Sequence, residues 1–206
     1  MPRTTSAVNT VARDADATTG RQRVLDAAAA LFVQQGYAGT TLREIAESAG
    51  IKAGSIYHHF ASKEALFVAV LHDGIVVMIE AFDHANTSLS ATDDLDTQIQ
   101  SHVRAHLSAV FENGPYTTAH VTSFFGAPAE VRVAVVPQRD SYEQKWNQLF
   151  EQLWPAADPK ELRLRRLILF GAMNATAEWF DPAGSLSVDQ LAASISNQFV
   201  HGVDQL

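Results

Sequence analysis

The segment from Lys52 to His59 gathers side chains that donate hydrogen bonds or carry positive charge, and it contains no carboxylate. Ile56 and Phe60 are spaced four residues apart, so a helix from about Ala53 to Phe60 would turn both of them inward. The residues left outward would then be Lys52, Gly54, Ser55, Tyr57, His58 and His59. Such a surface suits DNA, because a helix in the major groove meets base edges near its N-terminus and phosphates at its flanks.

The start signals of two further helices flank this segment. Thr41 and Glu44 have the spacing of a capping box, in which each side chain satisfies a free backbone amide of the other residue. Gly50 is expected to end that first helix, because glycine adopts the left-handed backbone without penalty. Ser62 is the expected cap of the next helix, where Lys63 and the exposed amides would suit a phosphate. The order of these elements predicts a helix-turn-helix that binds DNA.

This stretch resembles the N-terminal domain of the TetR family of bacterial transcriptional repressors. The resemblance covers residues 21–71 and is carried by these motifs: Gly36-Tyr37, Thr40-Thr41, Ile45-Ala46, Ala49-Gly50-Ile51, Gly54, Ile56-Tyr57, His59-Phe60 and Lys63-Glu64. It implies that double-stranded operator DNA is contacted by Thr41, Arg43, Lys52, Ala53, Gly54, Ser55, Tyr57, His58, His59 and Lys63. Ala53 departs from the polar residue of some family members, so it can meet a thymine methyl group but cannot hydrogen-bond a base.

The net charge of -8 is distributed unevenly along the chain. Residues 1–66 hold seven Lys/Arg and six Asp/Glu, whereas residues 67–206 hold eight and seventeen. DNA phosphates would repel the acidic part, so binding is expected at the N-terminal end, where Arg3, Arg13, Arg21 and Arg23 would help.

Three regions are expected. Residues 1–18 lack periodicity and are predicted to be a disordered tail, with an arm along the DNA as the alternative. Residues 19–66 are predicted to form the DNA-binding domain, whose first helix would run from Thr19 to Gln35 and end at Gly36. Residues 67–206 are expected to form an effector-binding and dimerisation domain. A helix from about Ser62 to Ala85 would cross from one domain to the other and transmit movement between them.

Composition narrows the class of protein. At 47% hydrophobic residues the chain has the composition of a soluble globular protein. The absence of cysteine excludes disulfides and thiolate nucleophiles. We find no apolar run near the roughly 20 residues that cross a bilayer, and no apolar signal segment at the N-terminus. We therefore expect no membrane partner and a bacterial cytoplasmic location.

The rest of the chain is predicted to be helical, which makes the fold class all-α. Proline and glycine divide it into helices at about Thr97–Phe111, Tyr116–Phe125, Ala129–Val136, Pro137–Trp154, Pro159–Phe180 and Ser187–Val203. His102 and His106 have the spacing of metal ligands on one helical face. Because no third ligand can be located in the sequence, we expect neither a metal nor a cofactor.

The family resemblance also implies an effector pocket in the C-terminal helices and a four-helix dimer interface made by the last two helices of each protomer. The expected pocket residues are His102, His106, Phe111, Phe124, Phe125, Tyr142, Trp146, Phe150, Asn174 and Glu178. The alternative to an effector pocket is that these aromatic residues, which recur at helical spacing, only fill the hydrophobic core. The expected homodimer interface contains Leu167, Gly171, Ala175, Leu191, Ile195 and Phe199.

Residues 169–192 look like the same segment of a TetR subgroup whose effectors include acyl-CoA thioesters. Ala175 stands where that subgroup often has a bulky aromatic residue, so the pocket shape is expected to differ. Another apolar or aromatic small molecule is the competing effector. The CoA phosphates would be met by Arg132, Arg139, Arg165 and Arg166.

Two other classes of function compete with a transcriptional regulator. An enzyme is disfavoured because the chain has no nucleophile elbow and no phosphate-cradling loop, so no catalytic residues are expected. A helical adaptor that does not bind DNA is the second rival. It would lack the steep salt dependence that phosphate contacts give to DNA binding.

Overall fold

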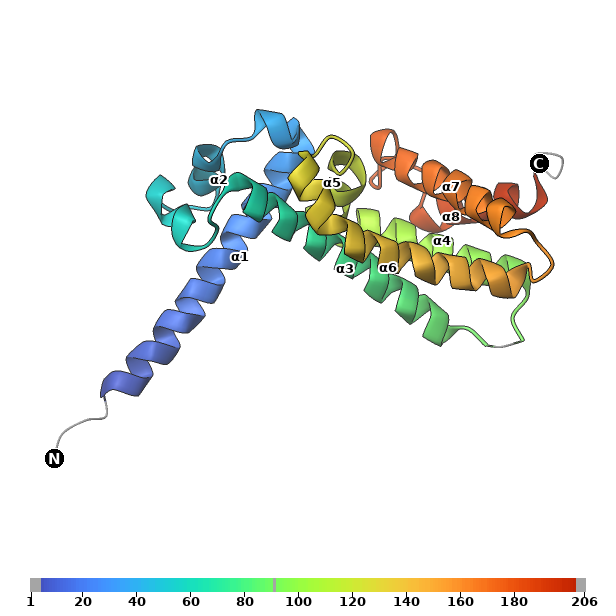
Figure 1. Ribbon diagram of the computed structural model, residues 1–206, viewed down its shortest axis with the longest axis horizontal. Coiled ribbons are helices and arrows are strands. Elements are labelled where there is room, and N and C mark those ends of the chain that lie inside the picture. The colour runs from blue at the N-terminus through green and yellow to red at the C-terminus, as the bar shows by residue number, and fades with distance from the viewer. Residues whose placement is uncertain (1–4, 91, 203–206) are drawn as a thin grey trace.

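The computed structural model describes residues 5–90 and 92–202. Within these ranges the chain is helical and has no strand, which confirms the all-α prediction (Figure 1). In chain order the elements are α1 (Thr5–Gly39), α2 (Leu42–Ser48), the 3-10 helix η1 (Ala53–His58), α3 (Lys63–Ser88), α4 (Leu95–Phe111), α5 (Pro115–Ser123), α6 (Ala129–Leu153), α7 (Pro159–Ala175), the 3-10 helix η2 (Thr176–Glu178) and α8 (Val188–His201).

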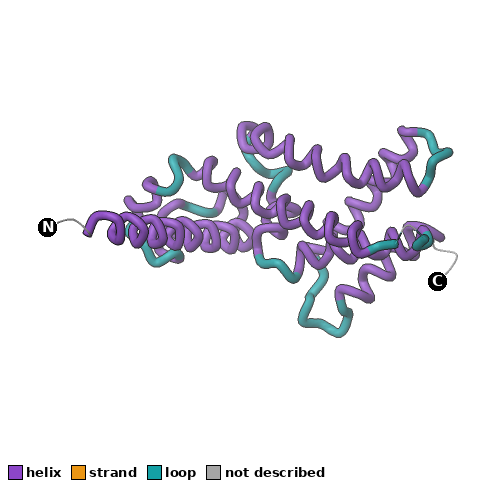
Figure 2. The backbone as a smooth tube through the Cα atoms, turned by 90° about the horizontal axis from the view of Figure 1, so that it is seen from below, coloured by secondary structure: helices purple, strands orange, loops and turns teal. Residues whose placement is uncertain are grey.

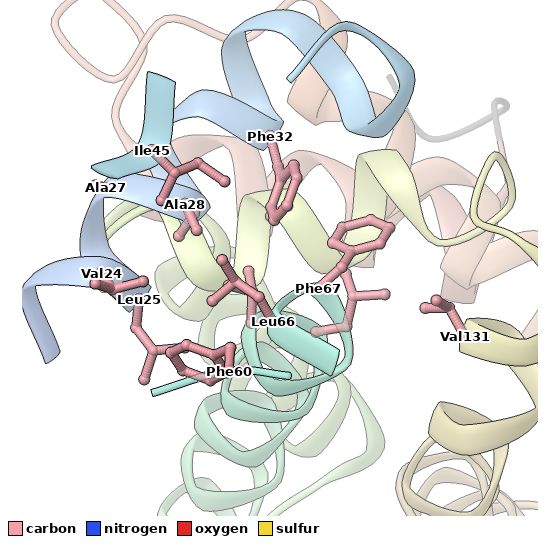
Figure 3. Packing of buried hydrophobic residues seen from close by; sticks show 14 of the residues in the cluster. Val24, Leu25, Ala27, Ala28, Phe32, Ile45, Phe60, Leu66, Phe67 and Val131 are labelled. Atoms are coloured by element: carbon pink, nitrogen blue, oxygen red, sulfur yellow. The ribbon is translucent and has the colours of Figure 1, made fainter. Parts of the chain in front are cut away.

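The first hydrophobic cluster holds α1, α2, η1 and the start of α3 together. Phe32, Ile45, Ile56 and Leu66 are fully buried in it (Figure 3). Val131 of α6 lies at the edge of the same cluster, which also includes buried residues of α5. The small N-terminal core is therefore completed by helices that come much later in the sequence.

The second cluster fills the space between the remaining helices. Trp146 and Phe150 of α6 are fully buried there, against α4, α7 and α8. α3 contributes to both clusters, because Leu71 belongs to the first and Ile75 to the second. This long helix is the physical connection between the two cores.

α1 begins at Thr5, whereas the sequence indicated a tail without structure up to residue 18. Ala7, Ala12, Ala15 and Ala17 favour the helix, and extending an existing helix avoids the cost of a new nucleus. This part leads away from the other helices in Figure 1, and its first turns form the N-terminal end of the molecule in Figure 2. Residues 1–4 of the expected tail lie outside the described residues. At the other end Gly36 has φ 70°, so the helical geometry breaks where the sequence predicted.

Pro137 lies inside α6, where the sequence predicted a break between two helices. Proline has no amide hydrogen to donate to the carbonyl of Val133, one turn earlier. Val133 is 73% exposed, so water can take the missing hydrogen bond and the helix continues. The predicted start of the last helix agrees with the structure, because Ser187 and Gln190 form the predicted capping box of α8.

α3 corrects the expectation that no apolar run approaches membrane-spanning length. Its 26 residues are long and apolar enough, by length and composition, to cross a bilayer. Leu66, Phe67, Val70 and Leu71 are nevertheless fully buried against other helices. The high apolar content follows from the position of α3 between two cores, so we describe it as a core helix.

Candidate nucleic-acid interface and inner cavity

The capping box at the start of α2 is formed by the predicted pair. The hydroxyl of Thr41 accepts from the Glu44 amide at 3.2 Å, and the Thr41 amide donates to Glu44 Oε2 at 2.8 Å. The Thr41 hydroxyl and then the Thr41 amide, which both donate to this carboxylate, hold the pKa of Glu44 below its usual range. Because the Thr41 hydroxyl also donates to Glu44, at 2.7 Å, both donors of Thr41 are already engaged. Thr41 thus caps α2 as predicted, and its contact with operator DNA stays a prediction.

η1 carries half of the ten residues predicted to meet DNA. It ends at His58, before the predicted Phe60, because the Phe60 ring turns into the core and is only 7% exposed. Tyr57 is 60% exposed. The other exposed residues of the predicted set are Thr41, Arg43, Lys52, Ala53, Gly54 and His58. Ser55, His59 and Lys63 are half-buried. The exposed face of η1 thus carries hydrogen-bonding groups and no carboxylate.

His59 lies against α1, which covers part of its ring. A Cβ atom placed on Gly20 would be 3.3 Å from His59 Nε2, so the absence of a side chain at Gly20 makes room for this histidine. Beside it, the Arg21 guanidinium lies 5.0 Å from the centre of the Phe60 ring. Arg21 is exposed and lies next to η1. The sequence connected this arginine with DNA only through its charge, and the structure shows where it lies.

Lys63 is positioned by Tyr37, to which the sequence assigned no role. The Lys63 ammonium lies 4.0 Å from the centre of the Tyr37 ring, a cation–π contact. The Tyr37 hydroxyl donates to Glu64, and the Ser62 hydroxyl accepts from the Ala65 amide at 3.1 Å. Burial lowers the pKa of Lys63 from its usual value. The lysine predicted to meet a phosphate is thus held by a ring from α1 at the capped start of α3.

A small cavity of about 10 Å³ lies between α3, α4, α5, α6 and α7. This is about the volume that one water molecule requires, so larger occupants would need the walls to move. Three predicted pocket residues line it: His106, Tyr142 and Asn174. Seven other residues complete the lining: Ile75, Met78, His120, Val121, Arg139, Glu143 and Phe170.

His106 connects two helices across this cavity. Its Nε2–H donates to Asn174 Oδ1 at 3.1 Å, because a carbonyl oxygen can only accept. Its Nδ1 then accepts from the Tyr142 hydroxyl at 3.0 Å. Burial lowers the pKa of His106 to about 4, so the ring is neutral at pH 7. α4, α6 and α7 are therefore tied together by a neutral hydrogen-bonded chain.

His120 forms a second connection, which the sequence did not indicate because no motif or spacing singles it out. Its Nδ1–H donates to the Leu71 carbonyl of α3 at 2.8 Å, and its Nε2 accepts from Arg139 Nη1 at 3.2 Å. Burial and the charge of Arg139 lower its pKa to about 3. His120 of α5 thus joins α6 to the backbone of α3.

The other predicted pocket residues lie elsewhere. Phe125 is 72% exposed and Glu178 is also exposed, because both stand near helix ends. Phe124 is buried in the first cluster, next to the DNA-binding part, and Phe111 packs on Phe180 with 4.8 Å between ring centres. The last three residues, His102, Trp146 and Phe150, are buried core behind the cavity.

His102 also does not combine with His106 in a metal site. The ring Nδ1–H of His102 donates to the Gln98 carbonyl at 2.8 Å, while both nitrogens of His106 have the partners described above. Over residues 5–90 and 92–202 there is no group of three His, Cys, Asp or Glu side chains placed to hold a metal ion.

α7 exposes an apolar strip that includes three of the six predicted dimer residues, Leu167, Gly171 and Ala175. Leu164, Leu167 and Ile168 are 57%, 51% and 58% exposed, and Gly171, Ala172 and Ala175 continue the strip. A groove of about 240 Å³ between α7 and α8 is lined by Ile168, Leu169, Ala172, Ile195, Gln198 and Phe199. Leu191 differs from the prediction, because it is 4% exposed and packs inside its own protomer.

Comparisons with known proteins agree with this geometry. A family model described as bacterial regulatory proteins, tetR family, matches residues 24–70, and one described as tetracyclin repressor-like, C-terminal domain, matches residues 92–203. The HTH-type transcriptional repressor KstR2 of Rhodococcus jostii (strain RHA1) is 30% identical over 193 residues, which cover 86% of this chain and 90% of KstR2. KstR2 of Mycolicibacterium smegmatis is 51% identical over 53 residues, 26% of each chain.

Solved structures share the fold. A TetR-family transcriptional regulator from Bordetella parapertussis 12822 superposes with a TM-score of 0.79 at 24% identity, covering 90% of this chain and 96% of that chain. AibR, crystallised with isovaleryl coenzyme A and operator DNA, superposes with a TM-score of 0.74 at 20% identity, covering 87% and 97%. At these identities the likeness concerns the fold alone.

Proposed function

Because this chain belongs to the TetR family of bacterial regulatory proteins, we propose that it is a transcriptional repressor that binds a palindromic operator as a homodimer and is released by a small molecule. The observation that carries the proposal is the exposed face of η1, which offers Lys52, Tyr57 and His58 without a carboxylate. Lys63, held on the Tyr37 ring, adds a phosphate contact at the edge of this face.

The apolar strip of α7 supports the homodimer. Large side chains such as Ile168 rarely stay exposed side by side in a monomer, and Gly171 and Ala172 next to them allow close approach of a second helix. A two-fold dimer would repeat η1 about 34 Å away, in the next major groove on the same side of the DNA. The operator would then consist of two inverted half-sites.

α5 provides the route by which the inner cavity would affect DNA binding. One end of α5 is tied to the DNA-binding part, because the Tyr116 hydroxyl donates to Asp26 of α1 at 2.6 Å. The other end carries His120, which bonds both Arg139 at the cavity and Leu71 of α3. A ligand that moves Arg139 would therefore shift α5 against both α1 and α3. The effector acts by favouring a dimer whose two η1 helices no longer fit both half-sites.

The effector is proposed to be small and largely apolar. Ile75, Met78, Val121 and Phe170 supply apolar walls. Acyl-CoA thioesters are one candidate class, supported by the likeness of residues 169–192 to that subgroup and by the AibR complex with isovaleryl coenzyme A. Because the cavity is only about 10 Å³, binding requires the walls to separate.

The test is binding of the purified chain to DNA from upstream of its own gene and of the neighbouring genes, followed by anisotropy with and without acyl-CoA thioesters. We expect specific binding with steep salt dependence, at a stoichiometry of two chains per operator, and release by an effector. Sequence-independent binding, or no binding, would contradict the repressor. Specific binding that no thioester affects would retain the repressor and exclude this effector class.

A further inference from the structure

Two guanidinium groups share one carboxylate beside the inner cavity. Arg166 of α7 is 5% exposed and donates to Glu143 through Nη1. Arg139 of α6, one turn before Glu143, lies 3.9 Å from its other oxygen, too far for a hydrogen bond. Glu143 is thus engaged by Arg166, and the largely buried Arg139 has no carboxylate within hydrogen-bonding distance among the described residues.

The other contacts of Arg139 do not replace a carboxylate. Its Nη1 donates to His120, and its guanidinium lies 4.0 Å and 5.5 Å from the ring centres of Phe124 and Phe125. Within residues 5–90 and 92–202, Nη1 is the only atom of Arg139 that donates a hydrogen bond. Across the cluster, the buried Nε of Arg166 also lacks an acceptor in the described part of the chain. The group therefore has one positive charge and several donors in excess.

We propose that the cavity beside Arg139 binds the carboxylate of an apolar or aromatic monocarboxylic acid, with Arg139 as the recognition residue. This inference rests on the proposed function and names the class of its effector. A single carboxylate would accept two parallel hydrogen bonds from the guanidinium and give each arginine one carboxylate. A phosphate would bring about two negative charges next to Glu143, which makes it the poorer fit. The ligand body would lie against Met78, Val121 and Phe170.

The same contact would couple recognition to release. A ligand carboxylate competes with His120 for the donors of Arg139, and His120 is bonded to the Leu71 carbonyl of α3. Loss of the Arg139 bond frees α5 from α6 on the side that faces the cavity. Neutral ligands of the same shape lack the charge that draws Arg139 away.

The experiment compares three forms of each acid by calorimetry with the full chain. The acids are butanoate, hexanoate, octanoate, decanoate, phenylacetate and 3-phenylpropanoate, each tested beside its primary amide and its CoA thioester. We expect at least one acid to bind about 10-fold or more tightly than its amide and its thioester, the ratio for a charge-assisted hydrogen-bonded pair. If no acid is preferred over its amide, the proposal is wrong. Tighter binding of the thioester would also overturn it and would favour the acyl-CoA effector.

Single substitutions test which arginine is responsible for the preference for the acid. Arg139→Gln should abolish the preference for the acid, while Arg104→Gln, at an exposed arginine of α4 paired with Asp189, should keep it. Should Arg139→Gln fail to fold, Arg139→Lys keeps the charge but loses the forked geometry, and the preference should fall several-fold. An unchanged preference in these Arg139 variants contradicts the assignment.

The operator is titrated with the same preparations. If the chain binds the operator but does not prefer any acid over its amide, the proposed function is supported and this inference is wrong. If the chain binds no operator, the proposed function is wrong, whatever the affinity of the chain for acids.

Discussion

The DNA-binding face and the inner cavity use polar side chains in opposite ways. On the DNA-binding face, Tyr57 and His58 point into solvent and have no hydrogen-bond partner among the described side chains. Around the cavity, His106, His120 and Arg139 are buried or nearly so, and each bonds to a residue of another helix. The first region is ready to bind another molecule. In the second, the ring nitrogens of both histidines already have partners, so a ligand must exchange these bonds, while Arg139 keeps N–H groups without an acceptor among the described residues.

This difference predicts how each region responds to substitution. Removing an exposed side chain usually changes the free energy of unfolding by less than about 0.5 kcal/mol, so changes at η1 should affect DNA binding alone. Removing one partner of a buried pair leaves the other unsatisfied, which costs about 1–3 kcal/mol. Changes at the cavity should therefore alter stability and regulation together.

The largest effect is expected at Gly74, where α5 touches α3. A Cβ atom there would lie 2.4 Å from the Tyr116 carbonyl oxygen, which is backbone and cannot rotate away. Gly74→Ala should lower the free energy of unfolding by about 2–3 kcal/mol, measured by urea denaturation. Gly126→Ala, with no atom nearer than 3.9 Å, is the matched control and should change it little. Equal effects would show that the α3–α5 contact is not tight.

Acid should destabilise the inner region next most strongly. The folded-state pKa values of His106 and His120 are lowered to about 4 and about 3, whereas the unfolded chain takes up their protons near 6.5. Stability is therefore complete above pH 6.5 and falls as the pH decreases below it, by up to about 1.4 kcal/mol per pH unit for each histidine. Urea denaturation at pH 7.5 and 5.5 measures the loss. His106→Gln should reduce this loss of stability, whereas His58→Gln, at an exposed position, should not. The reverse result would contradict the difference drawn between the two regions.

Substitutions on the DNA-binding face should change affinity without changing stability. Tyr57→Ala or Lys63→Ala is expected to weaken operator binding roughly 10-fold, since each contact contributes about 1–3 kcal/mol to base recognition or a phosphate contact. For Lys63→Ala the salt dependence should also decrease, by about one phosphate for each half-site and therefore about two for the dimer. Fluorescence anisotropy gives the affinity, and sedimentation confirms that the dimer persists. An unchanged affinity would remove the residue from the interface.

Thr41 gives the smallest effect and separates its two possible roles. Thr41→Ala removes the cap of α2 and should lower the free energy of unfolding by about 1 kcal/mol. Thr41→Asp restores a capping oxygen but adds a negative charge near the DNA. If Thr41 is a cap, Asp should recover the stability seen in thermal denaturation. If it also lies at a phosphate, Asp should weaken operator binding more than Ala does.

Local sequence patterns predicted the helix-turn-helix well because each signal acts over a few residues. The Thr41–Glu44 capping box, the left-handed Gly50 and the Ser62 cap all formed as predicted. The exposed face of η1 followed from the inward positions of Ile56 and Phe60. The predicted helix end at Phe60 was less accurate, because η1 ends at His58, where packing of Phe60 into the core turns the backbone out of the helix.

The inner cavity could be predicted only in part, because its residues meet through tertiary contacts. Of the residues predicted for an effector pocket, His106, Tyr142 and Asn174 line this cavity, whereas His120 lines it too but carries no spacing signal. Arg139 was expected to bind a CoA phosphate, and nothing local reveals that it is largely buried beside Phe124. The continuation of α6 through Pro137 likewise depends on which side of the helix faces water.

The sharing of the first hydrophobic cluster has a consequence for engineering chimaeric regulators. Five buried residues that follow α3 in sequence complete the core beneath the DNA-binding helices: Ala119, Phe124, Ala127, Val131 and Val135. A fusion that joined this N-terminal part to a foreign ligand-binding domain within α3 would replace these residues and leave a poorly packed junction. A workable graft would transfer these five residues along with the helix-turn-helix, so the unit of exchange in this protein is discontinuous in sequence.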